Sequence, residues 1–181
     1  MNYNTIKNCD IANGYGVRVS IFVSGCTNHC KECFQPETWN FDYGVPFDQS
    51  TIDNILKLMS ESYIEGLTIL GGEPMEPLNQ SEVLHLIREV KEKYPEKSIW
   101  IYSGFTYEDI TNPYKYPYVK DISYEILKNI DVLVDGRFVR ELHDPSLKFR
   151  GSSNQRIIDI KRTLLLGKVV EIDYKDRECS K

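Results

Sequence analysis

The chain has 181 residues, of which 41% are hydrophobic and 27% are charged, a composition that predicts one globular domain with a real core. The formal net charge is -5 and the lysines and arginines form no cluster, which argues against a nucleic-acid partner. Because no apolar run approaches the roughly 20 residues of a membrane span and the first residues lack a signal-peptide pattern, we expect a cytoplasmic protein with no membrane contact.

The first chemically informative stretch begins at the end of a predicted strand. Residues 17–24 are β-branched and aromatic, which predicts a short buried strand that ends at Gly25. Gly14 and Gly16, just before it, predict a turn. Three cysteines follow the strand directly, at the spacing C-x3-C-x2-C: Cys26, Cys30 and Cys33. In α/β sheets and barrels, the carboxyl end of a strand lies at the edge where active sites form.

Three thiols so close together can bind three corners of an iron–sulfur cube, because thiolates are the usual ligands of such clusters. A cube has four irons, so one iron is left without a protein ligand and can bind and react with a further molecule. The odd cysteine count, with only Cys9 and Cys179 standing apart, fits a reducing compartment better than a disulfide framework. We expect Cys9 to be a buried small hydrophobe rather than a ligand.

Two other uses of the cysteine loop stay open on the residues alone. The three thiols could hold a structural zinc ion with His29 as the fourth ligand, because zinc prefers four ligands. The loop could also belong to a simple electron carrier, although ferredoxin-type clusters are normally held by four cysteines. The cramped spacing around His29 argues against zinc, and neither remaining cysteine sits in a paired spacing that would complete a ferredoxin set.

The rest of the chain alternates between predicted helices and strands. Residues 34–49 predict a loop whose aromatic residues pack it down and could cover a cluster: Trp39, Phe41, Tyr43 and Phe47. Apolar residues at helical spacing predict helices over 50–64 and 79–94, the first with Ser50 and Asp53 as an approximate capping box. A shorter helix is predicted over 122–129. Further strands are predicted over three segments: 66–74, 98–104 and 131–136.

Repeated strand–loop–helix units predict an α/β fold with parallel strands joined by right-handed crossovers. A full eight-unit barrel takes about 250 residues, with about 200 near its lower limit, so this shorter chain predicts an open, incomplete (β/α) barrel. The open side could admit a large partner. We divide the chain into one domain over 1–160 and a C-terminal tail of unknown role over 161–181.

Two motifs together resemble the radical S-adenosylmethionine superfamily. One is the cysteine loop followed by Phe34, and the other is Gly71-Gly72-Glu73-Pro74 at the end of the next predicted strand. Over residues 1–156 the chain resembles, more narrowly, the family of anaerobic ribonucleoside-triphosphate reductase-activating proteins. Five further segments carry this narrower resemblance: 13–16, 22–26, 103–105, 134–138 and 150–155. Glu73 departs from the family pattern, in which Asp is frequent.

The resemblance implies an open barrel of the radical S-adenosylmethionine type with a [4Fe–4S] cluster on Cys26, Cys30 and Cys33. The amino and carboxylate groups of S-adenosylmethionine would chelate the fourth iron. The backbone of Glu32, Cys33 and Phe34 would contact the adenosyl part, with Phe34 near the adenine. Gly71 and Gly72 would approach the methionine amino group, where a side chain could not fit. No acid–base catalytic residue is implied, because the cysteines and the positioned cofactor carry the reaction.

The activity implied by the resemblance is reductive cleavage of S-adenosylmethionine to a 5′-deoxyadenosyl radical, which removes a Cα hydrogen from a glycine of the large reductase subunit. The implied partners are that subunit and an electron donor such as flavodoxin. An activase of another glycyl radical enzyme such as pyruvate formate-lyase, a radical enzyme acting on a small molecule and a non-catalytic metal-binding module remain as alternatives. We expect residues 150–155 to face the partner or to form a structural latch.

Overall fold

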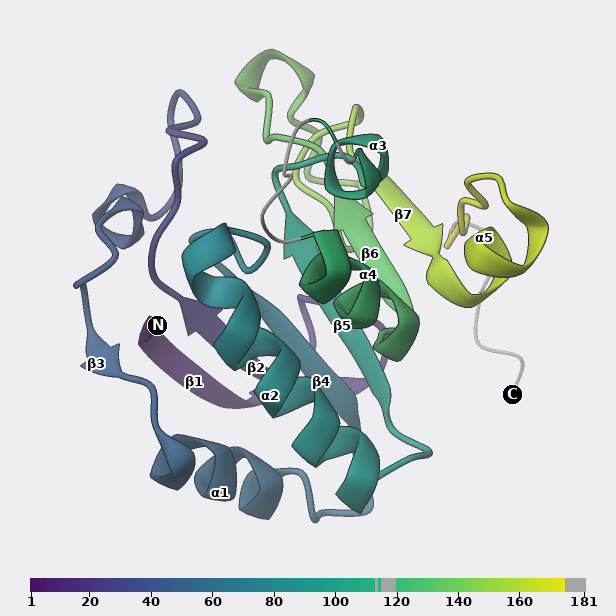
Figure 1. Cartoon of the computed structure of the whole chain (residues 1–181). Coiled ribbons are helices and arrows are strands. Elements are labelled where there is room, and N and C mark those ends of the chain that lie inside the picture. Colours follow the sequence, from purple (N-terminus) through teal and green to yellow (C-terminus); the bar gives the residue numbers. More distant parts are fainter. Residues whose placement is uncertain (113, 115–119, 175–181) are drawn as a thin grey trace.

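The computed structural model describes residues 1–112, 114 and 120–174, and these form one seven-stranded mixed sheet (Figure 1). Four neighbouring strands make its parallel centre, in the order β2-β4-β5-β6. Their bounds are β2 Val17–Val23, β4 Ile64–Gly71, β5 Ser98–Ser103 and β6 Val132–Asp135. Antiparallel strands flank this centre: β1 (Asn2–Asp10) and β3 (Val45–Pro46) on one side, β7 (Arg156–Asp159) on the other.

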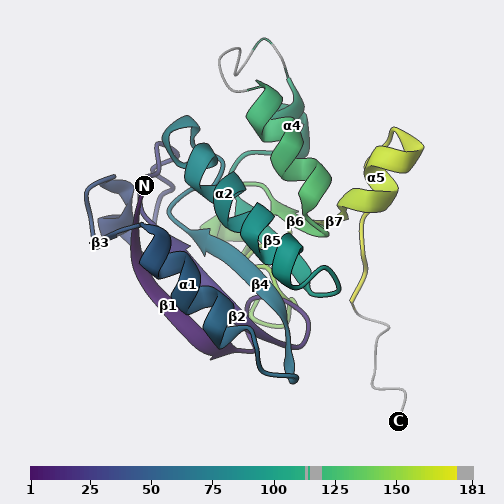
Figure 2. The same ribbon diagram turned by 60° about the horizontal axis from the view of Figure 1, so that its bottom comes forward.

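Helices cover one face of the sheet, and Figure 2 shows α1, α2 and α4 lying across it. The helices are α1 Gln49–Leu58, α2 Pro77–Lys93, α3 Tyr107–Thr111, α4 Lys120–Asn129 and α5 Ile160–Leu166, with 3-10 helices η1 Pro36–Trp39 and η2 Arg140–Leu142. Ile21, Ile69 and Ile101 are neighbours across three strands, and each is completely buried. They pack with the apolar stripes of the helices into the main core, whose burial is the chief stabilising term of the fold.

The opposite face of the sheet carries a smaller aromatic core. Trp100 and Val132 are partners across β5 and β6 and lie in this core. Tyr174, which follows α5 in the chain, packs here with its ring centroid 5.7 Å from that of Trp100 and 5.1 Å from that of Phe149. The hydroxyl of Tyr102 donates to the Phe149 carbonyl over 2.8 Å and so connects this layer to β5.

The segment after α5 is fastened to the edge of the sheet. The Asp159 amide donates to the Val170 carbonyl over 2.9 Å, and the Ile172 amide donates to the Ile157 carbonyl over 2.7 Å. Residues 170–172 therefore run beside β7 and deliver Tyr174 to the aromatic core. Within the preceding helix, Leu164 packs on the main core, whereas Leu165 and Leu166 are exposed.

The predicted α/β class and the four central parallel strands are confirmed, whereas the sheet as a whole is mixed. The antiparallel edge strands β1 and β7 were not predicted. Most of β1 is only partly buried, so it lacks the apolar run that marks the central strands. The prediction for Cys9 was wrong, because its side chain is exposed. Cys179 lies outside the described residues.

The first helix is shorter than predicted and has another cap. It ends at Leu58, and the last residue of the predicted helix, Ile64, instead begins β4. Its N-cap is Asp48, whose carboxylate accepts from the Thr51 amide over 3.0 Å, so the proposed capping box of Ser50 and Asp53 was wrong. Within the described residues, no helix has both the length and the apolar character needed to cross a lipid bilayer.

Candidate functional site

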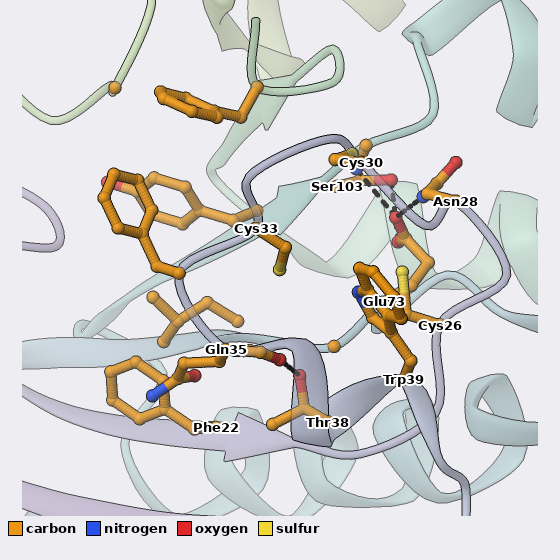
Figure 3. Close-up of a pocket in the computed structure, with 18 of the residues that line it drawn as sticks. Phe22, Cys26, Asn28, Cys30, Cys33, Gln35, Thr38, Trp39, Glu73 and Ser103 are labelled. Carbon is orange, nitrogen blue, oxygen red and sulfur yellow. Dashed lines mark hydrogen bonds between the residues drawn. The ribbon is translucent and has the colours of Figure 1, made fainter. Parts of the chain in front are cut away.

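A cavity of about 440 Å³ opens at the carboxyl ends of the parallel strands. Its lining comes from the loop after β2, the turn after β4 and the ends of β5 and β6 (Figure 3). The lining includes the whole C-x3-C-x2-C set: Cys26, Cys30 and Cys33. Figure 3 shows Cys33 on one side of the cavity and Cys26 and Trp39 on the other. The structure thus places the three cysteines around one cavity at the sheet edge that the sequence indicated.

The cysteine loop has an unusual backbone. His29 and Glu32, each directly before a cysteine, adopt left-handed conformations with φ of 44° and 58°. Such a conformation costs a non-glycine residue roughly 1–2 kcal/mol, so the surrounding structure must hold it. Burial raises the pKa of the Cys26 thiol to about 11 and also raises that of Cys30. Both are therefore neutral thiols at neutral pH, and metal binding must displace their protons.

Residues at the start of α2 hold the cysteine loop in place. The Asn79 amide group donates to the Ser24 carbonyl over 2.9 Å. The Glu76 carboxylate accepts from both the Thr27 amide, at 2.7 Å, and the Thr27 hydroxyl, at 2.6 Å. Since the two segments lie about 50 positions apart in the chain, these hydrogen bonds depend on the tertiary fold and not on local sequence.

Glu73 is the centre of a buried hydrogen-bond network. One carboxylate oxygen accepts from the Met75 amide at 2.9 Å and the Ser103 hydroxyl at 2.8 Å. The other accepts from the Gly104 amide at 2.7 Å and the Asn28 side chain at 3.0 Å. Burial raises the pKa of Glu73 to about 7, although hydrogen bonds from Met75, Ser103 and Gly104 lower it. The carboxylate therefore joins the cysteine loop to the end of β5.

Gly71 and Gly72 line the cavity, and the protein's own backbone accounts for the absence of side chains there. Gly71 has a φ of 112°, and a Cβ on it would lie 2.7 Å from the Val23 carbonyl oxygen. A Cβ on Gly72 would lie 2.8 Å from the Gly25 carbonyl oxygen. The Gly72 amide donates to the Val23 carbonyl over 2.7 Å. These glycines let the turn after β4 pack closely against the start of the cysteine loop.

Phe34 and Glu32, which were predicted to contact the adenosyl part of S-adenosylmethionine, lie in different places. Phe34 lines the cavity, is 70% exposed and packs against Phe138, with ring centroids 5.0 Å apart. The Glu32 side chain is not part of the lining. Its carboxylate lies 3.3 Å from the Arg140 guanidinium at the surface.

The loop over 150–155 is tied to the end of β6. The Gln155 side chain accepts from the Gly151 amide at 2.8 Å and donates to the Gly136 carbonyl at 3.0 Å. The Arg150 guanidinium donates to the Gln155 carbonyl at 2.6 Å. Gly136, Gly151 and Gln155 also line the cavity, so this loop forms part of its wall.

The donor set suits a cluster better than a lone ion. Among residues 1–112, 114 and 120–174, no three His, Cys, Asp or Glu side chains converge closely enough to hold one metal ion. A cube spreads its thiolate ligands over separate irons, so thiols around a shared cavity fit it. Two buried polar atoms of the lining residues, Trp39 Nε1 and Asn28 Oδ1, have no hydrogen-bond partner within these ranges. Buried polar atoms normally have a hydrogen-bond partner, so these two are exceptions within the site.

Sequence reasoning missed several residues of the site. Asn28, Glu76 and Asn79 carry no motif of their own, because their roles arise from contacts with distant segments. Trp39 was predicted as a packing residue of its loop that could also cover a cluster, and it lines the cavity. A signal for Asn28 was its place between Cys26 and Cys30.

The chain is similar to known proteins over most of its length. A family model described as a 4Fe-4S single cluster domain matches residues 12–158. Three relatives are each named anaerobic ribonucleoside-triphosphate reductase-activating protein. That of Enterobacteria phage T4 is 40% identical over 157 residues, which cover 87% of this chain and 93% of the relative. That of Vibrio cholerae serotype O1 is 40% identical over 159 residues, which cover 87% of this chain and 97% of the relative. That of Escherichia coli K12 is 37% identical over 157 residues, which cover 86% of this chain and 96% of the relative. The chain therefore belongs to the family of anaerobic ribonucleoside-triphosphate reductase-activating proteins, with a 4Fe-4S single cluster domain over residues 12–158.

Proposed function

We propose that the chain binds a [4Fe–4S] cluster through Cys26, Cys30 and Cys33 and works as an activating enzyme of anaerobic ribonucleoside-triphosphate reductase. The observation that carries this proposal is the placement of three cysteines from one loop around one cavity, in a chain of this family. Three protein thiolates leave one iron of a cube free for a second ligand.

The second ligand in this proposal is S-adenosylmethionine, which with the reduced cluster supplies a 5′-deoxyadenosyl radical. The exposed ring of Phe34 suits stacking on the adenine, and the backbone of Glu32 and Cys33 adjoins it. Gly71 and Gly72 offer backbone groups beside the cavity. The cavity volume of about 440 Å³ lies in the range of small-molecule sites. We assign no acid–base residue, because the Glu73 carboxylate is already engaged by four donors.

The protein partner in this proposal is the large subunit of the reductase, whose glycine loses a Cα hydrogen. A glycine backbone can enter a narrow opening, since it has no side chain. An electron donor such as flavodoxin would reduce the cluster in the cytoplasm. The net charge of -5 supports a function without nucleic acid.

The proposal extends to the architecture. Helices on one face of the sheet and a cavity at the strand ends support an open, incomplete (β/α) barrel of the radical S-adenosylmethionine type. In this proposal residues 1–160 form the radical domain and residues 161–181 its tail.

Anaerobic reconstitution with iron and sulfide tests the proposal. We expect a brown protein with four irons per chain. After reduction it should cleave S-adenosylmethionine to 5′-deoxyadenosine, and electron paramagnetic resonance should detect a glycyl radical when the reductase is added. A colourless zinc protein, or an intact cluster that leaves S-adenosylmethionine unbound, would overturn the proposal.

Mixtures with candidate partners separate the remaining alternatives. A radical that forms on pyruvate formate-lyase and not on the reductase would reassign the partner. Cleavage that leaves every glycyl radical enzyme without a radical would indicate a small-molecule substrate. Reversible reduction with no cleavage would indicate an electron carrier.

A further inference from the structure

A short segment that follows β6 lies directly against the cysteine loop. It covers residues 136–140, and we call it the bridging segment. The ring of Phe138 packs on that of Phe34, with centroids 5.0 Å apart, and both residues line the cavity. The Arg140 guanidinium lies 3.3 Å from the Glu32 carboxylate. Two side chains of the bridging segment therefore contact the chain around the third cysteine.

The bridging segment also reaches the sulfur atom of Cys30. Burial raises the pKa of the Cys30 thiol, whereas the Arg137 guanidinium and a hydrogen bond from the Phe138 backbone lower it. A sulfur that carries negative charge is an acceptor, so the donor in this bond is the Phe138 amide N–H. The backbone hydrogen bonds to Cys26, by contrast, come from within the cysteine loop itself. Cys30 therefore receives this hydrogen bond from a distant part of the chain.

The loop over 150–155 holds the bridging segment in place. Three hydrogen bonds of 2.9 to 3.2 Å connect the two: Gln155 Nε2 to the Gly136 carbonyl, Asn154 Nδ2 to the Arg137 carbonyl, and the Val139 amide to Ser152 Oγ. These bonds engage the residues directly before and after Phe138. They therefore restrict how far the Phe138 amide can turn away from Cys30.

A hydrogen bond to a ligand sulfur changes the energy of reducing an iron–sulfur cluster. Reduction adds negative charge, part of which lies on the sulfurs, and an N–H group that points at a sulfur stabilises this charge. Hydrogen bonds to the sulfurs are accordingly among the factors that set cluster potentials. The positive charge of Arg137, in the same segment, acts on Cys30 in the same direction.

We propose that the Phe138 amide N–H donates a hydrogen bond to the Cys30 sulfur in the cluster-loaded protein and raises the reduction potential of the cluster. Phe138 is thus a positioning and tuning residue, and it acts through its backbone. The loop over 150–155 is the latch that keeps this amide directed at Cys30. The inference rests on the proposed cluster, but not on the identity of the partner or of the nucleotide.

The test replaces one backbone amide by an ester and measures the reduction potential. Phenyllactate incorporated at position 138 keeps the benzyl side chain and removes the N–H group. Anaerobic redox titration of the reconstituted protein, without S-adenosylmethionine, should give a more negative midpoint potential than that of the wild type. Phenyllactate at Phe47 is the matched control, because the Phe47 amide donates to the Met1 carbonyl over 3.1 Å and Phe47 lies outside the cavity lining. The potential of this control should equal that of the wild type.

A second measurement covers an ester variant that fails to load its cluster. In protein labelled with ¹⁵N-phenylalanine, pulsed electron paramagnetic resonance of the reduced cluster should detect hyperfine coupling to a phenylalanine nitrogen. Phe138→Leu keeps the backbone N–H but leaves that nitrogen unlabelled, so the coupling due to position 138 should disappear, whereas any coupling due to Phe34 should persist. The midpoint potential of Phe138→Leu should equal that of the wild type, because the donor is retained.

Three outcomes would overturn different statements. A wild-type protein that assembles no cluster refutes the proposed function itself. A loaded position-138 ester with an unchanged potential, or a Phe138→Leu spectrum that retains the full coupling, refutes only the role of the Phe138 amide. An equal shift in the Phe47 ester also refutes that role, because the change in potential would then come from the ester and not from the bond to Cys30.

Discussion

The side chain of Asn28 donates to Glu73 over 3.0 Å and so connects the cysteine loop to the turn after β4. The two residues are 45 positions apart, and both line the same cavity. Gly104 fits beside them only because it lacks a side chain, since a Cβ there would lie 2.6 Å from the Asn28 amide nitrogen. The cysteine loop, the turn after β4 and the residue that follows β5 therefore meet at this buried contact.

Replacing Asn28 tests this connection. Asn28→Ala should lower the free energy of unfolding of the metal-free protein by about 2 kcal/mol, because a hydrogen bond to a charged group is lost. Asn28→Asp should cost more at pH 8 than at pH 5, since two carboxylates then face each other and protonation relieves their repulsion. Urea unfolding at both pH values measures the difference. An Asp variant with the same stability loss at each pH would contradict the prediction.

Glu73→Gln should remove one component of the pH dependence of stability. Burial raises the pKa of Glu73 from 4.5 to about 7, so the folded state binds this proton more tightly than the unfolded chain. The stabilisation is fully present below about pH 4.5 and is lost as the pH rises to about 7. The stability of the wild type minus that of Glu73→Gln should fall by on the order of 3 kcal/mol over this window. Urea unfolding at pH 5 and pH 7.5 measures it, and a constant difference would show that Glu73 titrates normally.

Alanine at the double glycine should be more harmful than alanine at another glycine with positive φ. Gly71→Ala combines an unfavourable φ of 112° with a backbone clash, so we expect a loss of about 3 kcal/mol in the free energy of unfolding. Gly167 is the control, because its φ is 65° and nothing lies within 4 Å of a Cβ there. Gly167→Ala should cost about 1 kcal/mol. Equal losses in denaturant titrations would mean that the turn relaxes around the added methyl group.

The cysteine set can be tested by iron content alone. Cys26→Ala, Cys30→Ala and Cys33→Ala should each abolish a stable four-iron cluster, because two thiolates hold the cube too weakly. Cys9→Ala should leave iron and sulfide unchanged, since Cys9 is exposed and lies outside the cavity lining. Iron and sulfide analysis after anaerobic reconstitution distinguishes the two classes. Loss of the cluster in Cys9→Ala would show that the ligand set is incomplete as assigned.

The centre of the fold was predictable from sequence, whereas its edges were not. The strands β2, β4, β5 and β6 are buried on both faces, which produces the apolar runs that identify them. The edge strand β1 has mixed polarity along its length, and β7 is only four residues long. Neither gives a periodic signal strong enough to separate it from a loop.

The candidate site divides in the same way. The cysteines and the double glycine were recognisable because local spacing defines them. The partners of Glu73 were not, since Asn28 and Gly104 reach it from segments that are distant in sequence. The position of the Trp39 nitrogen likewise depends on its stacking with His29, which no spacing rule predicts.

The aromatic layer beneath the cavity shows that the limit of sequence similarity is not the limit of the folded unit. The family match stops at residue 158, but Tyr174 lies against Trp100 and Phe149, under the floor of the site. A fragment that ends at the family boundary would expose those rings to water and leave the edge of β7 uncovered. Exposed sheet edges promote aggregation. A shortened version of the chain for crystallisation or labelling should therefore extend at least through Tyr174.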